Sequence, residues 1–161
     1  MLISKDIGNA GESLKEMKVN YEKNEISSIL LGKAKKEDIP KYGIAQIKKN
    51  SKFPGIGLIE KIIEKPSVKK APSNLYAAGR YIFTNDFFSY LSKAKPDKLD
   101  EIQLTDSIDL FIRDNKKVSA FPLDGKIFDC GDNLQLILAN LEFAMKDPIM
   151  KSKIKNYLQK K

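Results

Sequence analysis

The sequence predicts a mixed fold of helices and strands, either α/β or α+β, in one domain that covers residues 1–161. Short apolar runs of strand length alternate irregularly with helical patterns, so repeating βαβ units are not expected. The pair Asp124-Gly125 is a favoured hairpin turn, which predicts antiparallel neighbours in the sheet. Hydrophobic residues make up 42% of the chain, enough for a core of ordinary size.

The expected strands are apolar runs bounded by glycine, proline or charged residues. They cover 26–32, 43–48, 57–65, 75–83 and the two halves of 117–131 on either side of the predicted turn. The charged segment "KKEDIPKYG" is expected to be a connector, because Pro40 ends any local helix.

The expected helices have apolar residues at helical spacing or begin with a capping side chain. They are 12–23, a helix in "TNDFFSYLSK" capped by Thr84 or Asn85, a helix capped by Thr105 that ends near Asn115, a helix from Asp132 or Asn133 that stops before Pro148, and a basic helical tail at about 149–161.

Absent residue types exclude several kinds of chemistry. The chain has no histidine, which excludes Ser-His-Asp and Cys-His catalysis and histidine metal sites. Cys130 is the single cysteine, so neither an internal disulfide nor a thiolate zinc site can form. Any metal would therefore be a hard ion held by carboxylates, namely magnesium, manganese or calcium.

The formal charge of +8 comes from 29 basic and 21 acidic residues. Only Arg80 and Arg113 are arginines, and the lysines are spread along the chain, which indicates solvated faces rather than a nucleic-acid surface. A small anionic ligand is compatible with this charge. No run is long and apolar enough for a membrane span, no signal-peptide pattern is present, and one cysteine fits a reducing compartment. We therefore expect a soluble, cytoplasmic protein.

The triplet Glu64-Lys65-Pro66 ends one of the predicted strands. A lysine there can present a point charge to a phosphate, and the neighbouring carboxylate can accept hydrogen bonds from sugar hydroxyls. Pro66 restricts the backbone directly after the pair. A solvated strand end is the alternative interpretation.

Two further stretches carry carboxylates. In "IFDCGD", Asp129 could hold a magnesium ion that substrate phosphates also bind, or Asp132 could simply cap the next helix. In "DEIQLTDSI", Glu101 and Asp106 could be ligands or could stabilise the helix dipole. No glycine-rich phosphate loop is present, because Gly8 and Gly11 fit neither standard pattern.

A series of ordered motifs resembles the C-terminal half of the bacterial UTP–glucose-1-phosphate uridylyltransferase family. The resemblance covers about residues 12–161. The motifs are KYG at 41–43, EKP at 64–66, APSNL at 71–75, GRY at 79–81, EIQLTD at 101–106 and DCG at 129–131.

The resemblance implies the carboxyl part of a Rossmann-like nucleotide-diphospho-sugar transferase fold, with a mixed sheet and flanking helices. It also implies that UTP and glucose 1-phosphate react, with Mg²⁺, to give UDP-glucose and pyrophosphate. The implied site residues are Glu64 for glucose hydroxyls, Lys65 for the sugar phosphate and as the catalytic residue, Gly43, Ala78, Gly79 and Glu101 for substrate contact, and Asp129 as the magnesium ligand.

The chain departs from the family pattern at its start. The N-terminal half, with its glycine-rich nucleotide loop, is missing, and "LISKDI" places Lys5 where the family's first metal-binding aspartate belongs. We therefore expect a truncated, inactive homologue that binds glucose 1-phosphate or UDP-glucose. The alternative is a subunit that docks on a separate N-terminal half or a full-length paralogue. A sheet cut in this way is also expected to be marginally stable or to self-associate.

Overall fold

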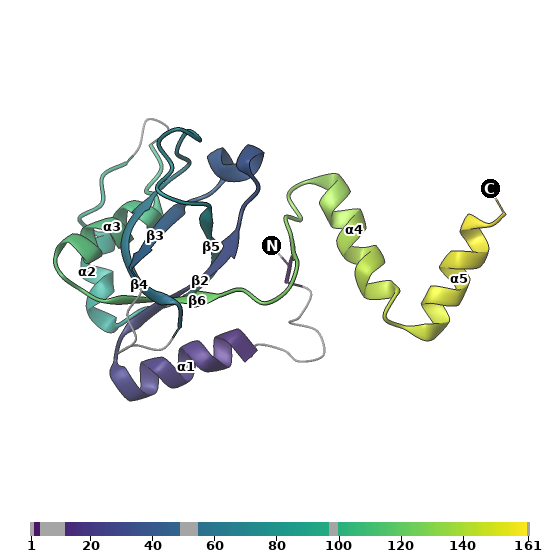
Figure 1. Ribbon diagram of the computed structural model, residues 1–161, viewed down its shortest axis with the longest axis horizontal. Coiled ribbons are helices and arrows are strands. Elements are labelled where there is room, and N and C mark those ends of the chain that lie inside the picture. The colour runs from purple at the N-terminus through teal and green to yellow at the C-terminus, as the bar shows by residue number, and fades with distance from the viewer. Residues whose placement is uncertain (1, 4–11, 49–54, 97–99, 161) are drawn as a thin grey trace. The chain divides into compact units, whose positions relative to one another are not determined.

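The computed structural model describes residues 2–3, 12–48, 55–96 and 100–160 (Figure 1). The chain divides into two compact units, one formed by residues 12–123 and the other by residues 1–11 with 124–161. Each unit is described by itself. The prediction of one domain over 1–161 stays a prediction.

Five strands of the larger unit form one mixed sheet that closes into a barrel (Figure 1). They are β2 (Ser27–Lys33), β3 (Ile44–Lys48), β4 (Gly57–Ile63), β5 (Leu75–Ile82) and β6 (Val118–Pro122), in the order β2-β5-β3-β4-β6. The sheet closes because β6 pairs antiparallel with β4 and parallel with β2. The predicted mixed sheet is confirmed, whereas its closure was not predicted.

Helices flank this sheet, as predicted. Helix α1 (Glu12–Asn24) contacts β2, and α3 (Leu104–Arg113) contacts β4. The segment after β5 forms a 3-10 turn, η3 (Asn85–Phe87), and then the short helix α2 (Phe88–Leu91), which contacts α3. Figure 1 shows α1 along one side of the barrel and α2 and α3 together at another.

The core of the larger unit lies between the sheet and the helices α2 and α3. Phe111 of α3 is at its centre, because Phe87 and Tyr90 both pack edge-on against its ring at centroid distances of 5.4 and 5.1 Å. Such edge-to-face pairs are favourable arrangements for aromatic rings. This packing holds α3 against the strands and so sets the position of the start of α3, next to the end of β4.

The smaller unit contains a two-stranded sheet and two helices. Strand β1 (Leu2–Ile3) pairs antiparallel with β7 (Ile127–Phe128), and α4 (Asn133–Ala144) and α5 (Pro148–Leu158) follow. The predicted hairpin at Asp124-Gly125 is therefore wrong. Strand β6 pairs with β2 and β4, whereas β7 pairs with β1, so the turn pair joins strands of different sheets.

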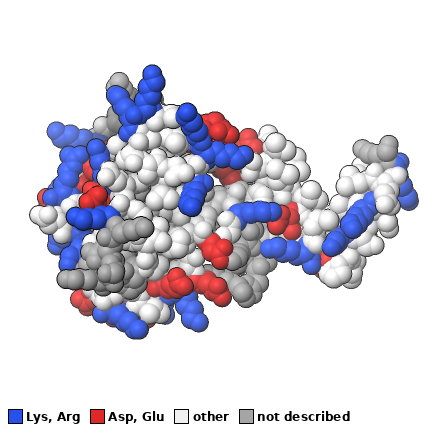
Figure 2. Space-filling model, viewed as in Figure 1, with Lys and Arg blue, Asp and Glu red and all other residues white. Residues whose placement is uncertain are grey.

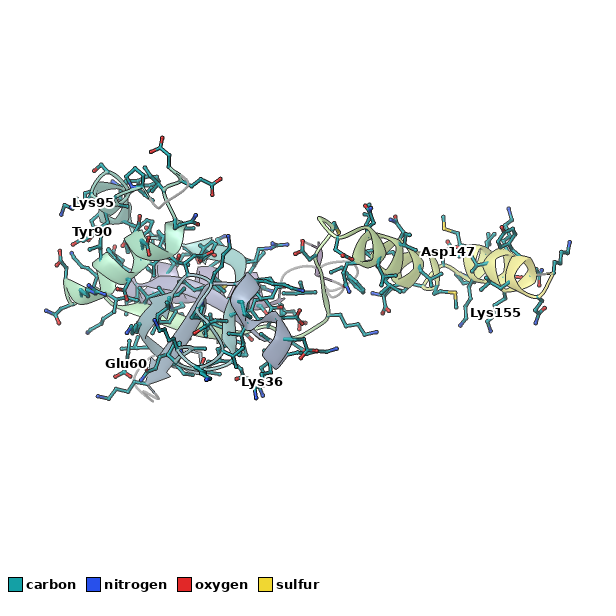
Figure 3. All side chains as sticks on the ribbon, turned by 90° about the horizontal axis from the view of Figure 1, so that it is seen from above. Lys36, Glu60, Tyr90, Lys95, Asp147 and Lys155 are labelled. Carbon is teal, nitrogen blue, oxygen red and sulfur yellow. The ribbon has the colours of Figure 1, made fainter. Side chains whose placement is uncertain are left out.

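Both predicted helices of the smaller unit are present, and an aspartate side chain caps each of them. The Asp132 side chain accepts a hydrogen bond from the Gln135 amide at 2.9 Å, which confirms the predicted start of α4. Asp147, labelled in Figure 3, caps α5 by accepting from the Met150 amide at 2.8 Å, with Pro148 in the first turn. The predicted break and basic terminal helix are thus present.

One local prediction for the larger unit is wrong. Helix α3 begins at Leu104 with Gln103 as its N-cap residue, so Thr105 lies inside the helix and does not cap it. The charged connector contains the 3-10 helix η2 (Lys36–Lys41), which ends one residue after Pro40, close to the predicted end. A 3-10 turn this short tolerates proline, since few of its amides need an internal partner.

Candidate functional site

The end of β4 is held in an unusual backbone conformation. Lys65 has a φ of 42°, in the left-handed region that residues other than glycine rarely adopt. Its amide donates to the Tyr42 carbonyl at 3.0 Å, which ties the strand end to the segment before β3. Such a conformation costs about 1–2 kcal/mol, so the surrounding structure must hold it in place. The Lys65 side chain remains 57% exposed, with its ammonium group available to a ligand.

The Glu64 carboxylate is oriented by a hydrogen bond from another element. Thr105 Oγ1 donates to Glu64 Oε2 at 2.9 Å, across 41 residues of sequence. The other carboxylate oxygen, Oε1, lies 3.8 Å from Lys65 Nζ. The Glu64 side chain is only 23% exposed, so this carboxylate lies at the edge of the packed interior rather than in open solvent.

Gly43 lies against the side chains of Thr105 and Glu64. A Cβ atom at position 43 would come within 2.5 Å of Thr105 Cγ2 and 3.1 Å of Glu64 Oε2. On its other side, the Gly43 carbonyl accepts a hydrogen bond from the Ala77 amide of β5 at 2.9 Å. The glycine therefore lets β5, the end of β4 and the start of α3 meet at one point.

A bulge in β5 begins one residue beyond Ala77. The register between β5 and β2 pairs Ala77 with Leu31 and Tyr81 with Ile29, so residues 78–80 lie opposite Leu30 alone. Gly79 has a φ of 73°, and a Cβ atom there would meet nothing within 4 Å. Ala78 is fully buried beside it. Bulges of this kind often re-aim a strand next to a functional site.

A groove of about 560 Å³ runs beside the Glu64-Lys65 corner, between β4 and α3. Its lining is mostly charged and includes Lys61, Ile62, Ile63, Glu64, Lys65, Gln103, Asp106, Asp109 and Arg113. Arg113 forms an ion pair with Asp109 at 2.5 Å on α3. The groove presents an ammonium group and a carboxylate side by side, which suits a ligand with both an anionic group and hydroxyls.

Glu101 lies at the surface before α3 and does not line this groove. Its Oε2 accepts a hydrogen bond from Gln103 Nε2 at 3.3 Å, and Gln103 does line the groove. Thr105, by contrast, contacts Glu64 directly, although the sequence identified it only as a cap. Its signal in the sequence was ambiguous, because a threonine near a helix start is usually a local capping residue.

Asp129 belongs to the smaller unit, where it forms a tight turn. Its Oδ1 accepts from the Gly131 amide at 3.2 Å, and its carbonyl accepts from the Asp132 amide at 3.0 Å. The adjacent Cys130 is half-buried, with its Sγ donating to the Phe128 carbonyl at 3.7 Å. In the described ranges no three acidic or cysteine side chains are close enough to hold a metal ion. One exposed aspartate fits a magnesium site only where substrate phosphates and water supply the remaining ligands.

Two tyrosines of β5 have raised pKa values. Burial is the main cause at Tyr81, and the negative charge of Glu64 raises the Tyr81 pKa further. Burial also raises the pKa of Tyr76 to about 12, with smaller contributions from Tyr42 and Asp38. The rings of Tyr42 and Tyr76 stack at a centroid distance of 4.7 Å, and Tyr42 is the residue immediately before Gly43 in the sequence.

Residues 5–146 match the sequence profile of the family described as Nucleotidyl transferase. The chain belongs to the nucleotidyl transferase family. It is 36% identical over 136 residues to the UTP–glucose-1-phosphate uridylyltransferase of Haemophilus ducreyi, which covers 84% of this chain and 46% of that relative. It is 31% identical over 157 residues to the enzyme of that name from Streptococcus pyogenes, covering 96% of this chain and 51% of the relative. The chain thus spans about half the length of these relatives.

Solved structures agree with this family membership. A UDP-glucose pyrophosphorylase complexed with UDP-glucose superposes with a TM-score of 0.76 at 35% identity, covering 84% of this chain and 50% of the other. A UTP-bound enzyme from Acinetobacter baumannii superposes with a TM-score of 0.74 at 27% identity, covering 94% and 51%. The predicted transferase fold is confirmed by these neighbours. None of the helices in the described ranges combines the length and apolar character needed for a bilayer span.

Proposed function

We propose that this chain forms the sugar-phosphate half of a UTP–glucose-1-phosphate uridylyltransferase site and binds glucose 1-phosphate or UDP-glucose. The observation that carries the proposal is the oriented Glu64-Lys65 pair, with its carboxylate fixed by Thr105 and its backbone held left-handed. Glu64 accepts hydrogen bonds from glucose hydroxyls, and Lys65 neutralises the sugar phosphate. Substrate contact at Gly43, Ala78 and Gly79 is proposed from the family motifs alone, because none of the three lines the groove, and Glu101 acts from the groove's edge through Gln103.

The reaction of the family suits residues of this kind. The phosphate oxygen of glucose 1-phosphate forms a bond to the α-phosphorus of UTP while the bond to pyrophosphate breaks, so no covalent enzyme intermediate is needed. Catalysis then depends on positioning and charge neutralisation, which lysine and carboxylates supply without histidine. Mg²⁺ would be held by Asp129 together with substrate phosphates, where it neutralises phosphate charge.

We further propose that these 161 residues do not catalyse the reaction unaided. About half the length of the relatives has no counterpart in this chain. We propose a cytoplasmic location, which the single half-buried cysteine supports. Nucleic acid is not among the proposed partners, because basic and acidic side chains are interspersed on the visible surface (Figure 2).

The test is a titration of glucose 1-phosphate with Mg²⁺, followed by NMR of the isotope-labelled chain. We expect chemical-shift changes near Glu64, Lys65 and Asp129. Lys65→Met should weaken binding at least tenfold, whereas Lys61→Met is the matched control, since Lys61 lines the same groove on β4. Equal affinities for the two variants would reject the assigned role of Lys65. A coupled UDP-glucose assay tests inactivity, and turnover in the ordinary range of about 1–1,000 per second would overturn it.

A second candidate function, a subunit that complements a separate N-terminal transferase half, is favoured by the surface of α4. Its apolar side chains point in several directions and are exposed, with Leu134 at 60% and Ile137 at 62%, and only Ala139 is buried. A helix with this much exposed apolar surface is normally covered by other protein. Because α4 lies within the residues that match the family, the occupant that we propose is the half of the relatives that has no counterpart in this chain.

Mixing the chain with the separately produced N-terminal half of a related uridylyltransferase tests this second candidate. We expect a complex and recovered UDP-glucose formation. The double substitution L134Q/I137Q should weaken the complex at least tenfold, while Lys155→Gln on α5 serves as the control. Sedimentation of the chain alone distinguishes the other outcome, in which a second copy covers α4 and the chain self-associates.

A further inference from the structure

Thr105, the second residue of α3, makes a hydrogen bond to a distant segment. Threonines further along a helix commonly bond the carbonyl of the preceding turn, but no turn of α3 precedes Thr105. Here Thr105 Oγ1 donates instead to Glu64 Oε2 at 2.9 Å, at the end of β4. Thr105 is only 6% exposed, so bulk water cannot readily replace this donor. The bond therefore links a buried hydroxyl of α3 to a partly exposed carboxylate in the groove.

We infer that Thr105 is a positioning residue for the sugar-phosphate site, an inference that rests on the proposed function. A hydroxyl has one proton to donate, and here it occupies one site on Glu64 Oε2. Glu64 Oε1, on the Lys65 side, stays available to a ligand hydroxyl. Since a glutamate side chain turns about several bonds, fixing one oxygen holds the other in a single direction before the ligand arrives.

Gly43 makes this arrangement possible. The Thr105 methyl group occupies the space that a side chain at position 43 would need, since a Cβ atom there would lie 2.5 Å from Cγ2. The methyl packs against the glycine while the hydroxyl reaches Glu64. Because Thr105 is β-branched, its χ1 angle is stiff, and the contact with Gly43 selects the rotamer that aims the hydroxyl at the carboxylate. Two segments that are distant from Glu64 in the sequence thus fix its carboxylate.

Two substitutions separate positioning from mere structural support. Thr105→Val keeps the branched shape but removes the donor. Thr105→Ser keeps the donor but removes the methyl that packs on Gly43. If Thr105 only stabilised the fold, affinity would follow stability in both variants. A positioning role predicts that the serine variant, although less well packed, rescues binding that the valine variant loses.

The experiment measures glucose 1-phosphate affinity by NMR titration, unfolding by urea, and the Glu64 χ1 rotamer from three-bond couplings. For T105V we expect about tenfold weaker binding, equivalent to about 1.4 kcal/mol, and an averaged Glu64 rotamer. For T105S we expect affinity within about twofold of the parent chain and a single rotamer. Equal affinity in T105V and the parent chain, or equal losses in both variants, would overturn the inference.

The rotamer measurement keeps this inference separate from the proposed function. If the parent chain does not bind glucose 1-phosphate, the proposed function fails, yet the couplings still report whether the Thr105 hydroxyl orients Glu64. One rotamer in the parent and T105S, with averaging in T105V, would support positioning. The same rotamer distribution in all three proteins would reject it. Should T105V fail to fold, Thr105→Ala, which also removes the donor, takes its place in the same measurements.

Discussion

Gly43 and Thr105 interlock so closely that position 43 has no room for a side chain: a Cβ atom there would lie 2.5 Å from Thr105 Cγ2. The two residues are far apart in the chain, yet their contact sets the direction of the Glu64 carboxylate. Position 43 requires glycine because a side chain would have no room, whereas position 79 requires glycine because its backbone φ is positive. The two positions therefore respond differently to the same substitution.

The first prediction concerns Gly43→Ala. The added methyl must displace Thr105 or Glu64, so we expect a loss of about 1–3 kcal/mol in the free energy of unfolding and weaker glucose 1-phosphate binding. Urea denaturation and NMR titration measure the two effects. In a T105S background, which lacks the clashing methyl, the cost of G43A should fall by about 1 kcal/mol or more. The same cost in both backgrounds would contradict the packing described.

Gly79→Ala is the second prediction. No neighbour lies within 4 Å of the added atom, so the cost comes from the φ of 73° alone. We expect about 1–2 kcal/mol of destabilisation, and a smaller loss for Gly79→Asn because asparagine tolerates left-handed backbone better. Urea unfolding of the two variants provides the comparison. If asparagine destabilises as much as alanine, backbone strain is not the reason for glycine at this position.

The third prediction separates stability from binding at Lys65. Its φ of 42° is strained for lysine, so Lys65→Gly should be about 1 kcal/mol more stable than Lys65→Ala. Both variants lack the ammonium group and should lose glucose 1-phosphate affinity to the same extent. Thermal or urea unfolding gives the stability order, and NMR gives the affinities. An alanine variant as stable as the glycine variant would show that the left-handed conformation is not strained.

The fourth prediction is an alkaline loss of stability from Tyr76. Burial raises the Tyr76 pKa from 10.0 to about 12, so the folded state holds the phenol proton more tightly than the unfolded chain. The stabilisation is complete below pH 10 and disappears as the pH rises toward 12. Urea unfolding at increasing pH measures the decline. Lysines titrate in the same range, so the matched control is Tyr76→Phe, which should lack this component. Superimposable pH profiles would exclude Tyr76 as its source.

Much of the secondary structure could be predicted because its signals are local. The apolar runs that became β2 to β5 are bounded by breakers, and the α4 and α5 caps depend on Asp132 and Asp147, a few residues from their partners. The motif resemblance also identified the Glu64-Lys65 corner. In the structure, Glu64 and Lys65 line one groove together with residues of α3. The assigned roles of these residues stay predictions.

The failed predictions share a physical reason, since each concerned a choice between a local and a distant partner. Thr105 has the right residue type for a cap, but its hydroxyl bonds Glu64, 41 residues away. Asp124-Gly125 has the right residues for a hairpin turn, but β6 pairs with β2 and β4 in the closed sheet instead of with β7. Local propensity cannot weigh such alternatives, because the competing partner is brought close only by the folded chain.

The sequence by itself determined the family, the order of most helices and strands, and the chemical types available to the site: a lysine, several carboxylates, and no histidine. The tertiary structure alone decided that β6 closes the barrel, that residues 78–80 form a bulge, and that Thr105 and Gly43 orient Glu64. Residue types and short-range spacing can be read directly from the sequence. The direction of a carboxylate depends on packing between segments that meet only after folding.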